Sequence, residues 1–214
     1  DLDDLDEILK LALVEKPNRV VITGDLIDKL AWLPQVCERL TTFAKQIPDG
    51  VDFILGNHEY HHDVNKVLDE LKHNTPMNIL VNSNIQIMGG KQPVYIAGVA
   101  YDNDREKEKR EAMIDKALSG IPDYAFVILL AHHPEFFEEA VERKIPLTLS
   151  GHTHGGQIVF MGMPLVPTGT PYTKGRYVEE QSVCYVNNGS GHWFPIRINC
   201  PREITVITFF DGVA

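Results

Sequence analysis

Residues 150–157, with the sequence Ser-Gly-His-Thr-His-Gly-Gly-Gln, constrain this chain more than any other segment. They follow the apolar run 145–149, which predicts a buried strand. His152 and His154 are one residue apart, and the neighbouring glycines allow the main chain to turn tightly beneath the two rings. Because histidine is the commonest metal-ligand residue, the segment predicts a metal site. The alternative is a flexible loop that carries two surface histidines.

Three other segments combine a hydrophobic run with a following polar cluster. The clusters are Gly24-Asp25-Leu26-Ile27-Asp28, Gly56-Asn57-His58-Glu59 and Ala131-His132-His133-Pro134-Glu135. Each has the layout of a strand, then a turn, then polar side chains. Since this layout occurs four times along the chain, we expect the four loops to converge on one site beyond the strand ends.

Length and composition indicate one soluble globular domain that covers residues 1–214. The formal net charge of −10 disfavours nucleic acid as an obligate partner, because binding to phosphate backbones normally requires a basic surface. Bound cations would still allow an anionic substrate. The three cysteines lack the C-x-x-C spacing of a thiolate metal site, so we expect buried free thiols.

No apolar run reaches the length of about eighteen residues that a membrane helix needs, and no signal peptide is visible. The chain begins at Asp1 and enters a helical pattern at once. We therefore expect an upstream segment that holds any anchor or targeting signal. The expected location is the cytoplasm or the membrane periphery of a bacterium.

Hydrophobic periodicity predicts a layered α/β domain. The predicted helices span 1–16, 34–46, 64–73, 102–118 and 134–143, and the predicted strands span 19–23, 51–55, 78–81, 85–88, 94–99, 124–130 and 145–149. Further short runs near residues 158, 177, 184–186, 196–198 and 204–210 predict a meander of mixed or antiparallel strands. Alternation of strands and helices favours an α-β-β-α sandwich of two mixed sheets with helices outside.

The ligand types in the four loops fit a dinuclear metal centre. A pair of divalent ions needs one bridging oxygen, and Asp25 is the expected bridge. Asn57, His132 and His152 are expected to hold one ion, and His154 the other. This mixture of oxygen and nitrogen favours manganese, with iron or zinc as alternatives, over calcium. The chemistry that such a centre performs best is hydrolysis of a phosphate ester.

His58 follows a predicted metal ligand directly, so its ring is expected to point toward the substrate. There it would protonate the leaving oxygen, with Glu59 holding its tautomer. The alternatives for His58 are a further metal ligand or a structural loop residue. Asp28 is expected to fix its loop by hydrogen bonding, and His133 to pair with Glu135 or face solvent.

The order of these motifs resembles the calcineurin-like metallophosphoesterase superfamily. The string at 150–157 and the ending at 196–204 are similar to its YkuE-like branch of bacterial phosphoesterases. The resemblance implies the layered fold and a two-metal centre. It assigns the bridging role to Asp25, the first metal to Asn57, His132 and His152, the second metal to His154, and catalysis to His58 together with Asp25.

The chain departs from the family pattern at its start. The family opens with a strand that ends in Asp-x-His and supplies two ligands to the metal held by the counterpart of His154, and no such motif precedes Asp25. Asp1 and Asp3 are too close to Asp25 and are already helical. We therefore expect either that the first strand lies in an upstream segment, or that one of the two metal sites is deficient.

Together these features predict a metallophosphoesterase that hydrolyses phosphomonoesters or phosphodiesters. The resemblance implies substrates that are lipid-linked or small phosphodiesters, with membrane association through the upstream segment. Two alternative functions stay open: a nuclease, and a metal-poor scaffold on the same fold that binds a protein partner.

Overall fold

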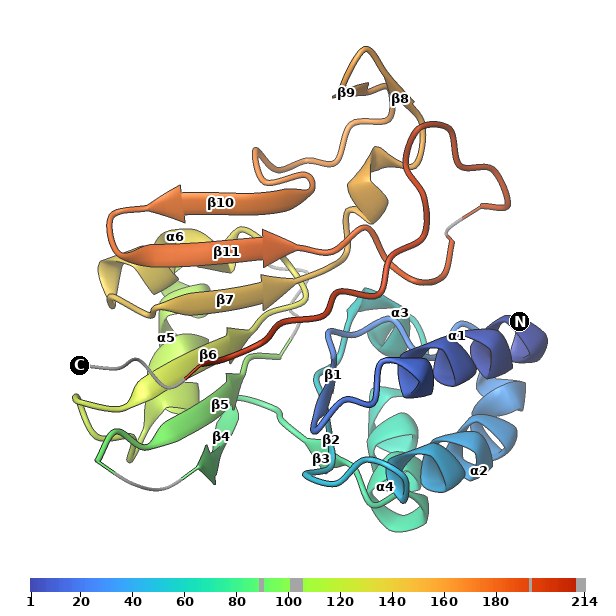
Figure 1. Cartoon of the computed structure of the whole chain (residues 1–214), viewed down its shortest axis with the longest axis horizontal. Helices are drawn as coiled ribbons and strands as arrows, with labels where there is room; N and C mark the ends of the chain where they lie inside the picture. The colour runs from blue at the N-terminus through green and yellow to red at the C-terminus, as the bar shows by residue number, and fades with distance from the viewer. Residues whose placement is uncertain (89–90, 101–105, 193, 211–214) are drawn as a thin grey trace.

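The computed structural model describes residues 1–88, 91–100, 106–192 and 194–210 (Figure 1). The smaller sheet contains three parallel strands, in the order β1 (Val20–Ile22), β2 (Val51–Phe53) and β3 (Asn78–Ile79). The larger sheet is mixed and has the order β10-β11-β7-β6-β5-β4. Its strands are β4 (Ser83–Met88), β5 (Val94–Gly98), β6 (Phe126–Leu130), β7 (Leu147–Ser150), β10 (Gly175–Glu179) and β11 (Ser182–Val186).

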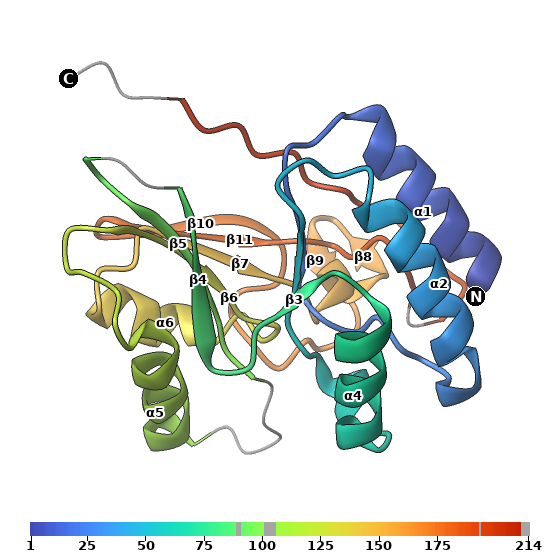
Figure 2. The ribbon, with the colours of Figure 1, turned by 90° about the horizontal axis from the view of Figure 1, so that it is seen from below.

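Helices cover the outer faces of the two sheets, on opposite sides of the molecule (Figure 2). The helices α1 (Leu2–Val14), α2 (Leu33–Ala44) and α4 (Val64–Asn74) pack on the smaller sheet. The helices α5 (Lys107–Leu118) and α6 (Phe136–Glu142) pack on the larger sheet. This arrangement confirms the prediction of a layered α/β sandwich.

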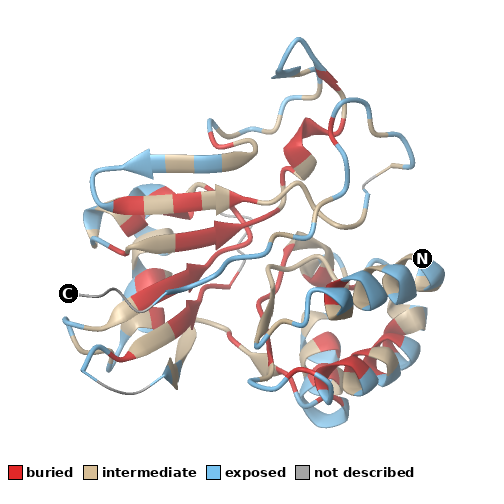
Figure 3. Cartoon of the chain, viewed as in Figure 1, coloured by how far each residue is buried: buried red, intermediate tan, exposed pale blue. Residues whose placement is uncertain are grey.

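The strand β6 shows how the sequence produces these layers. Side chains alternate between the two faces of a strand, and here both faces are apolar. Val127 and Leu129 belong to the core beneath α5 and α6, whereas Ile128 and Leu130 belong to the core between the two sheets. Figure 3 shows the central strands as largely buried. A continuous apolar run is what a strand covered on both faces requires.

Several short elements complete the fold. They are the 3-10 helix η1 (Leu30–Trp32), the helix α3 (Asn57–Tyr60), the 3-10 helix η2 (His154–Gly156) and a two-stranded hairpin of β8 (Val159–Phe160) and β9 (Met163–Pro164). The hairpin projects from the body of the protein (Figure 1). No helix in the described ranges is both long enough and apolar enough to span a bilayer.

Most predicted elements are found within a few residues of their expected bounds. The predicted helix 102–118 is α5, and its predicted residues 102–105 lie outside the described residues. All three cysteines are free and buried, as expected. The helix α3 was not predicted, because its four residues are too few to show a helical period.

The prediction of strands at 196–198 and 204–210 is wrong. Ile198 forms only an isolated bridge with Ile158, and 204–210 has no regular secondary structure. The sequence Ile-Thr-Val-Ile-Thr-Phe-Phe at 204–210 has high strand propensity. Propensity alone does not make a strand, because the backbone must also find a neighbouring edge to bond.

A buried ion pair holds the three strands of the smaller sheet together. Asp52 on β2 is fully buried and accepts hydrogen bonds from Arg19 at 2.8 and 3.0 Å. Asn78 on β3 donates to the same carboxylate at 2.8 Å. One carboxylate therefore links residues from three segments that are distant along the chain.

We expect Asp52→Ala to lower the free energy of unfolding by about 3 kcal/mol, because it leaves the guanidinium of Arg19 without its partner in a poorly hydrated site. Urea unfolding followed by circular dichroism would measure this change. Asp49→Ala, at an exposed position near the same strand, is the control and should change the stability by less than about 0.5 kcal/mol. Equal stability of the two variants would contradict the role assigned to Asp52.

Candidate metal centre

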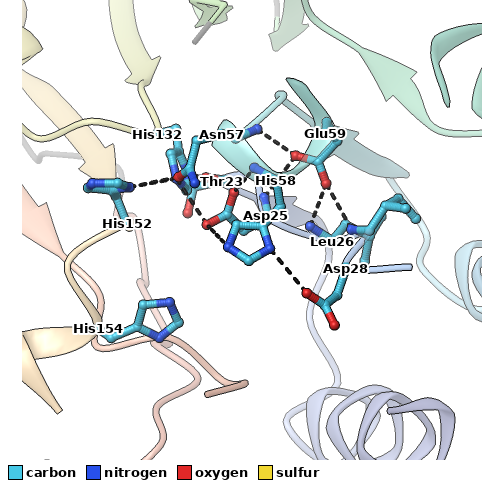
Figure 4. A network of polar contacts seen from close by, with 12 residues as sticks. Thr23, Asp25, Leu26, Asp28, Asn57, His58, Glu59, His132, His152 and His154 are labelled. Atoms are coloured by element: carbon cyan, nitrogen blue, oxygen red, sulfur yellow. Dashed lines mark hydrogen bonds and ion pairs between the residues drawn. The ribbon is translucent and has the colours of Figure 1, made fainter. Parts of the chain in front are cut away.

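Four side chains from four loops meet at the carboxyl ends of the strands (Figure 4). Asp25 follows β1, Asn57 follows β2, His132 follows β6 and His152 follows β7. The ligand atoms of Asp25, His132 and His152 all lie within 4.8 Å of one another. The loops predicted from sequence to converge therefore do so.

The spacing of the ligand atoms suits a single cation. His132 Nε2 lies 3.2 Å from Asp25 Oδ2 and 3.0 Å from Asn57 Oδ1. His152 Nδ1 lies 2.9 Å from Asn57 Oδ1 and 3.1 Å from His132 Nε2. Ligands that bind one ion at about 2.0–2.2 Å and at right angles are about 3 Å apart. Four of the six pairs of these atoms are thus at distances that suit one coordination shell.

The hydrogen bonding of His132 favours its role as a ligand. Its Nδ1 lies 2.7 Å from the carbonyl oxygen of Thr23. Because a carbonyl only accepts, Nδ1 carries a proton, so in the neutral form of the ring the lone pair is on Nε2 and faces the group. A backbone carbonyl that fixes the tautomer in this way is a common feature of histidine metal ligands.

The mutual interaction of Asp25 and His132 favours the ionised form of each side chain. Burial opposes ionisation of Asp25, but the charge and hydrogen bond of His132, with the amide of His58, hold the pKa of Asp25 well below its ordinary value. Burial likewise disfavours the charged form of His132, yet Asp25 raises its pKa above the ordinary value. Asp25 is therefore a carboxylate at neutral pH, as a metal ligand must be.

Tight backbone packing brings the loops this close. Asp25 has a left-handed φ of 57°, and Gly24 before it has a φ of 95°. A Cβ atom on Gly24 would lie 2.6 Å from both Gly56 N and His132 Nδ1. Only glycine fits at this position, since both the conformation and the space exclude a side chain.

Glu59 clamps two of the loops together. Its side chain is fully buried and accepts hydrogen bonds from the amides of Asp25 at 3.0 Å, Leu26 at 2.7 Å, Ile27 at 2.8 Å and Gly56 at 2.6 Å. Burial and the charge of Asp25 raise the pKa of Glu59, whereas the amides of Ile27 and Gly56 lower it. Glu59 thereby positions the backbone that carries Asp25.

The expectation that Glu59 holds the tautomer of His58 is wrong. The His58 ring instead faces Asp28, with Nδ1 3.3 Å from Asp28 Oδ1, while Nε2 lies 4.0 Å from Asp25 Oδ2. The backbone amide of His58 donates to Asp25 Oδ1 at 2.9 Å. His58 thus lies at the border of the group, and Asp28, expected only to fix its loop, is its ring partner.

The ring of His133 packs against the ring of His152. The two rings stack with centroids 3.9 Å apart, and His133 Nδ1 lies 3.8 Å from Glu135 Oε2. The His133 ring is almost completely buried. His152 has a left-handed φ of 68°, which is uncommon outside glycine although histidine adopts it more often than most residues. The stack covers one face of the His152 ring and so restricts its orientation.

His154 lies apart from the four ligands in Figure 4. Its Nδ1 lies 3.2 Å from Nη2 of Arg197, and burial together with the Arg197 charge lowers the pKa of His154 to about 4. Because a guanidinium only donates, Nδ1 is an acceptor and the ring proton lies on Nε2. The role of His154 as a ligand of a second ion stays a prediction. Arg197 was missed by the sequence analysis, which had no signal that joins residues 43 positions apart.

The similarity of this chain to known proteins identifies its family. A model of the calcineurin-like phosphoesterase family matches residues 1–156. This chain belongs to that family. The resemblance inferred from its motifs is therefore confirmed, and the four ligands and His58 lie in the part of the chain that the family model covers.

Relatives of this chain include proteins from distant organisms. The chain is 36% identical over 211 residues to an uncharacterized metallophosphoesterase of Campylobacter jejuni. The matched region covers 95% of this chain and 53% of that protein. The chain is 31% identical over 224 residues to the uncharacterized metallophosphoesterase YkuE of Bacillus subtilis, with 97% of this chain and 73% of that protein covered. The chain spans about half the length of several curated relatives that it matches.

The fold is also found in a solved structure. The NAD nucleotidase of Haemophilus influenzae superposes with a TM-score of 0.51 at 17% identity, over 85% of this chain and 42% of that chain. This degree of likeness supports the metallophosphoesterase fold.

We expect Glu59→Gln to lower the free energy of unfolding by about 2 kcal/mol. Glutamine keeps one acceptor oxygen but places an NH₂ group against backbone amides, so buried donors lose their acceptor. Chemical denaturation of Glu59→Gln, with exposed Glu38→Gln as the control, would measure the effect. If both variants are as stable as the wild type, the clamp assigned to Glu59 is not needed.

Proposed function

We propose that this member of the calcineurin-like phosphoesterase family is a metal-dependent hydrolase of phosphate esters. The observation that carries the proposal is the convergence of Asp25 Oδ2, Asn57 Oδ1, His132 Nε2 and His152 Nδ1 on one point, with His58 at the border. Such a set of ligands beside a positioned imidazole fits hydrolysis better than a purely structural role.

Asp25, Asn57, His132 and His152 would hold the first divalent ion. Their mixture of carboxylate, amide and imidazole atoms favours manganese, iron or zinc. When bound, such an ion polarises a phosphoryl oxygen and lowers the pKa of water. The depressed pKa of Asp25 favours the ionised carboxylate that a ligand must be.

A second ion would bind His154, and the contact of His154 with Arg197 limits when this can happen. Binding through Nε2 requires the ring proton on Nδ1, where Arg197 now donates. The guanidinium would therefore have to move before His154 could act as a ligand. Accordingly, we propose that the four-residue site fills first and that a dinuclear centre needs further ligands besides His154.

His58 is proposed as the acid that protonates the leaving oxygen. Nδ1 lies 3.3 Å from Asp28 Oδ1, and this contact leaves Nε2 toward the edge of the metal group, 4.0 Å from Asp25 Oδ2. The proposed substrates are small phosphodiesters, phosphomonoesters or lipid-linked phosphate esters. All of them carry an anionic phosphoryl group that suits a cationic centre on an otherwise acidic protein.

The ligand roles predict a specific pattern of metal loss. Asp25→Ala and His132→Ala should each lower the manganese affinity at least about tenfold, because each removes one of four ligands. Isothermal titration with manganese would measure this, and exposed Asp28→Ala should retain the affinity. Wild-type protein that binds no metal and hydrolyses neither p-nitrophenyl phosphate nor its bis ester would favour a scaffold function instead.

The role of His58 predicts a separation of activity from metal binding. His58→Ala should lower kcat for bis-p-nitrophenyl phosphate by roughly 10²–10⁴-fold while metal content stays unchanged. The exposed His73→Ala is the matched control and should retain full activity. Loss of metal in His58→Ala would identify it as a ligand, and unchanged kcat would exclude it from the reaction.

A further inference from the structure

The hairpin of β8 and β9 carries large apolar side chains into solvent. Phe160, Met161, Met163 and Leu165 are 60%, 83%, 64% and 62% exposed. Ile196 and Ile198 are also exposed on the segment that bonds to the base of the hairpin. We call these six residues the apolar hairpin surface. Such a group of neighbouring exposed apolar side chains marks an interaction site far more often than single exposed ones do.

The turn of the hairpin shows that its apolar character is not a requirement of folding. Phe160 pairs with Met163, so Met161 and Gly162 form a two-residue loop with φ values of 49° and 82°. Positive φ at both positions favours Asn or Asp at the first and Gly at the second. A methionine at the first position is therefore unfavourable both for the backbone and for its contact with water.

The base of the hairpin is held firmly. Val159 N donates to Ile198 O at 2.9 Å, and Asn199 Nδ2 donates to Val159 O at 3.0 Å. The Gln157 side chain donates to two carbonyls of the 194–196 segment at 2.9 and 3.0 Å. The tip is thus presented as a protrusion on an anchored base (Figure 1).

Charge is distributed unevenly around this surface. The chain has 30 acidic residues, yet none lies between Glu142 and Glu179, the interval that contains the hairpin. Lys174 and Arg176 follow the hairpin in the same interval. A protein with a net charge of −10 is repelled by anionic surfaces over most of its area. The hairpin and its flanking residues therefore add no acidic side chain of their own to this repulsion.

We propose that the apolar hairpin surface inserts into the interfacial region of a phospholipid membrane that contains anionic lipids. Met161, the most exposed of the six side chains at 83%, lies in the turn at the tip, and a projecting apolar tip can enter a lipid layer without a partner face of complementary shape. A lipid interface has no fixed shape and accepts apolar side chains together with nearby cations. Because the hairpin starts at Val159, five residues after His154, insertion would bring this side of the candidate metal centre toward the lipid headgroups.

The binding test uses vesicles and needs no enzymatic activity, so it is independent of the proposed hydrolysis. The purified chain should co-sediment with vesicles of phosphatidylcholine and phosphatidylglycerol, and less with phosphatidylcholine alone. Met163→Ser should lower the partition coefficient by roughly tenfold. Met88→Ser, which removes a methionine of similar exposure (58%) on β4, is the matched control and should bind like the wild type.

Met161→Asn separates lipid binding from folding. Asparagine suits the turn, so this variant should unfold at the same or a higher urea concentration than the wild type, yet bind vesicles several-fold more weakly. The proposal is overturned if the wild type does not bind either vesicle, or if Met161→Asn and Met163→Ser bind as well as Met88→Ser. It is equally overturned if ultracentrifugation finds a dimer that Met163→Ser dissociates, because a second copy would then cover this surface.

Discussion

The buried carboxylate of Glu59 is the contact on which the site depends. It accepts four backbone hydrogen bonds from two loops that follow neighbouring parallel strands. The amides of Asp25, Leu26 and Ile27 would otherwise be left without acceptors at the end of β1. By satisfying them, Glu59 sets the left-handed backbone of Asp25 and directs its carboxylate to His132. A buried carboxyl side chain thus positions the backbone that carries a candidate metal ligand.

Several residues in the loops of the same group have left-handed backbone conformations. Asp25, His152, His154 and Gln157 all have positive φ although none of them is glycine. Each such residue costs free energy that the surrounding contacts must offset. Here the contacts are the Glu59 clamp, the stack of His133 on His152 and the hydrogen bonds of Arg197 to His154. The strain therefore persists because several independent elements restrain each loop.

Much of the fold was predictable because it depends on local patterns. The apolar run of β6 and the amphipathic periods of α2 and α4 led to elements within a few residues of those found. The four polar clusters were predicted to meet because parallel strands present their carboxyl ends at one edge. The strand predicted at 204–210 shows the limit of this reasoning, because pairing depends on a neighbouring edge that the local sequence does not describe.

The sequence alone determined which chemistry was available: hard and borderline ligands after four strands, glycines where loops must approach, and an acidic chain with an acid-free interval. Only the tertiary structure decided which atoms meet. Asp28 rather than Glu59 faces the His58 ring, and Arg197 occupies Nδ1 of His154. The physical reason is the distance along the sequence over which each effect acts. Propensity and periodicity act over a few residues, whereas hydrogen bonds between residues more than 30 positions apart follow from the packing of the whole chain.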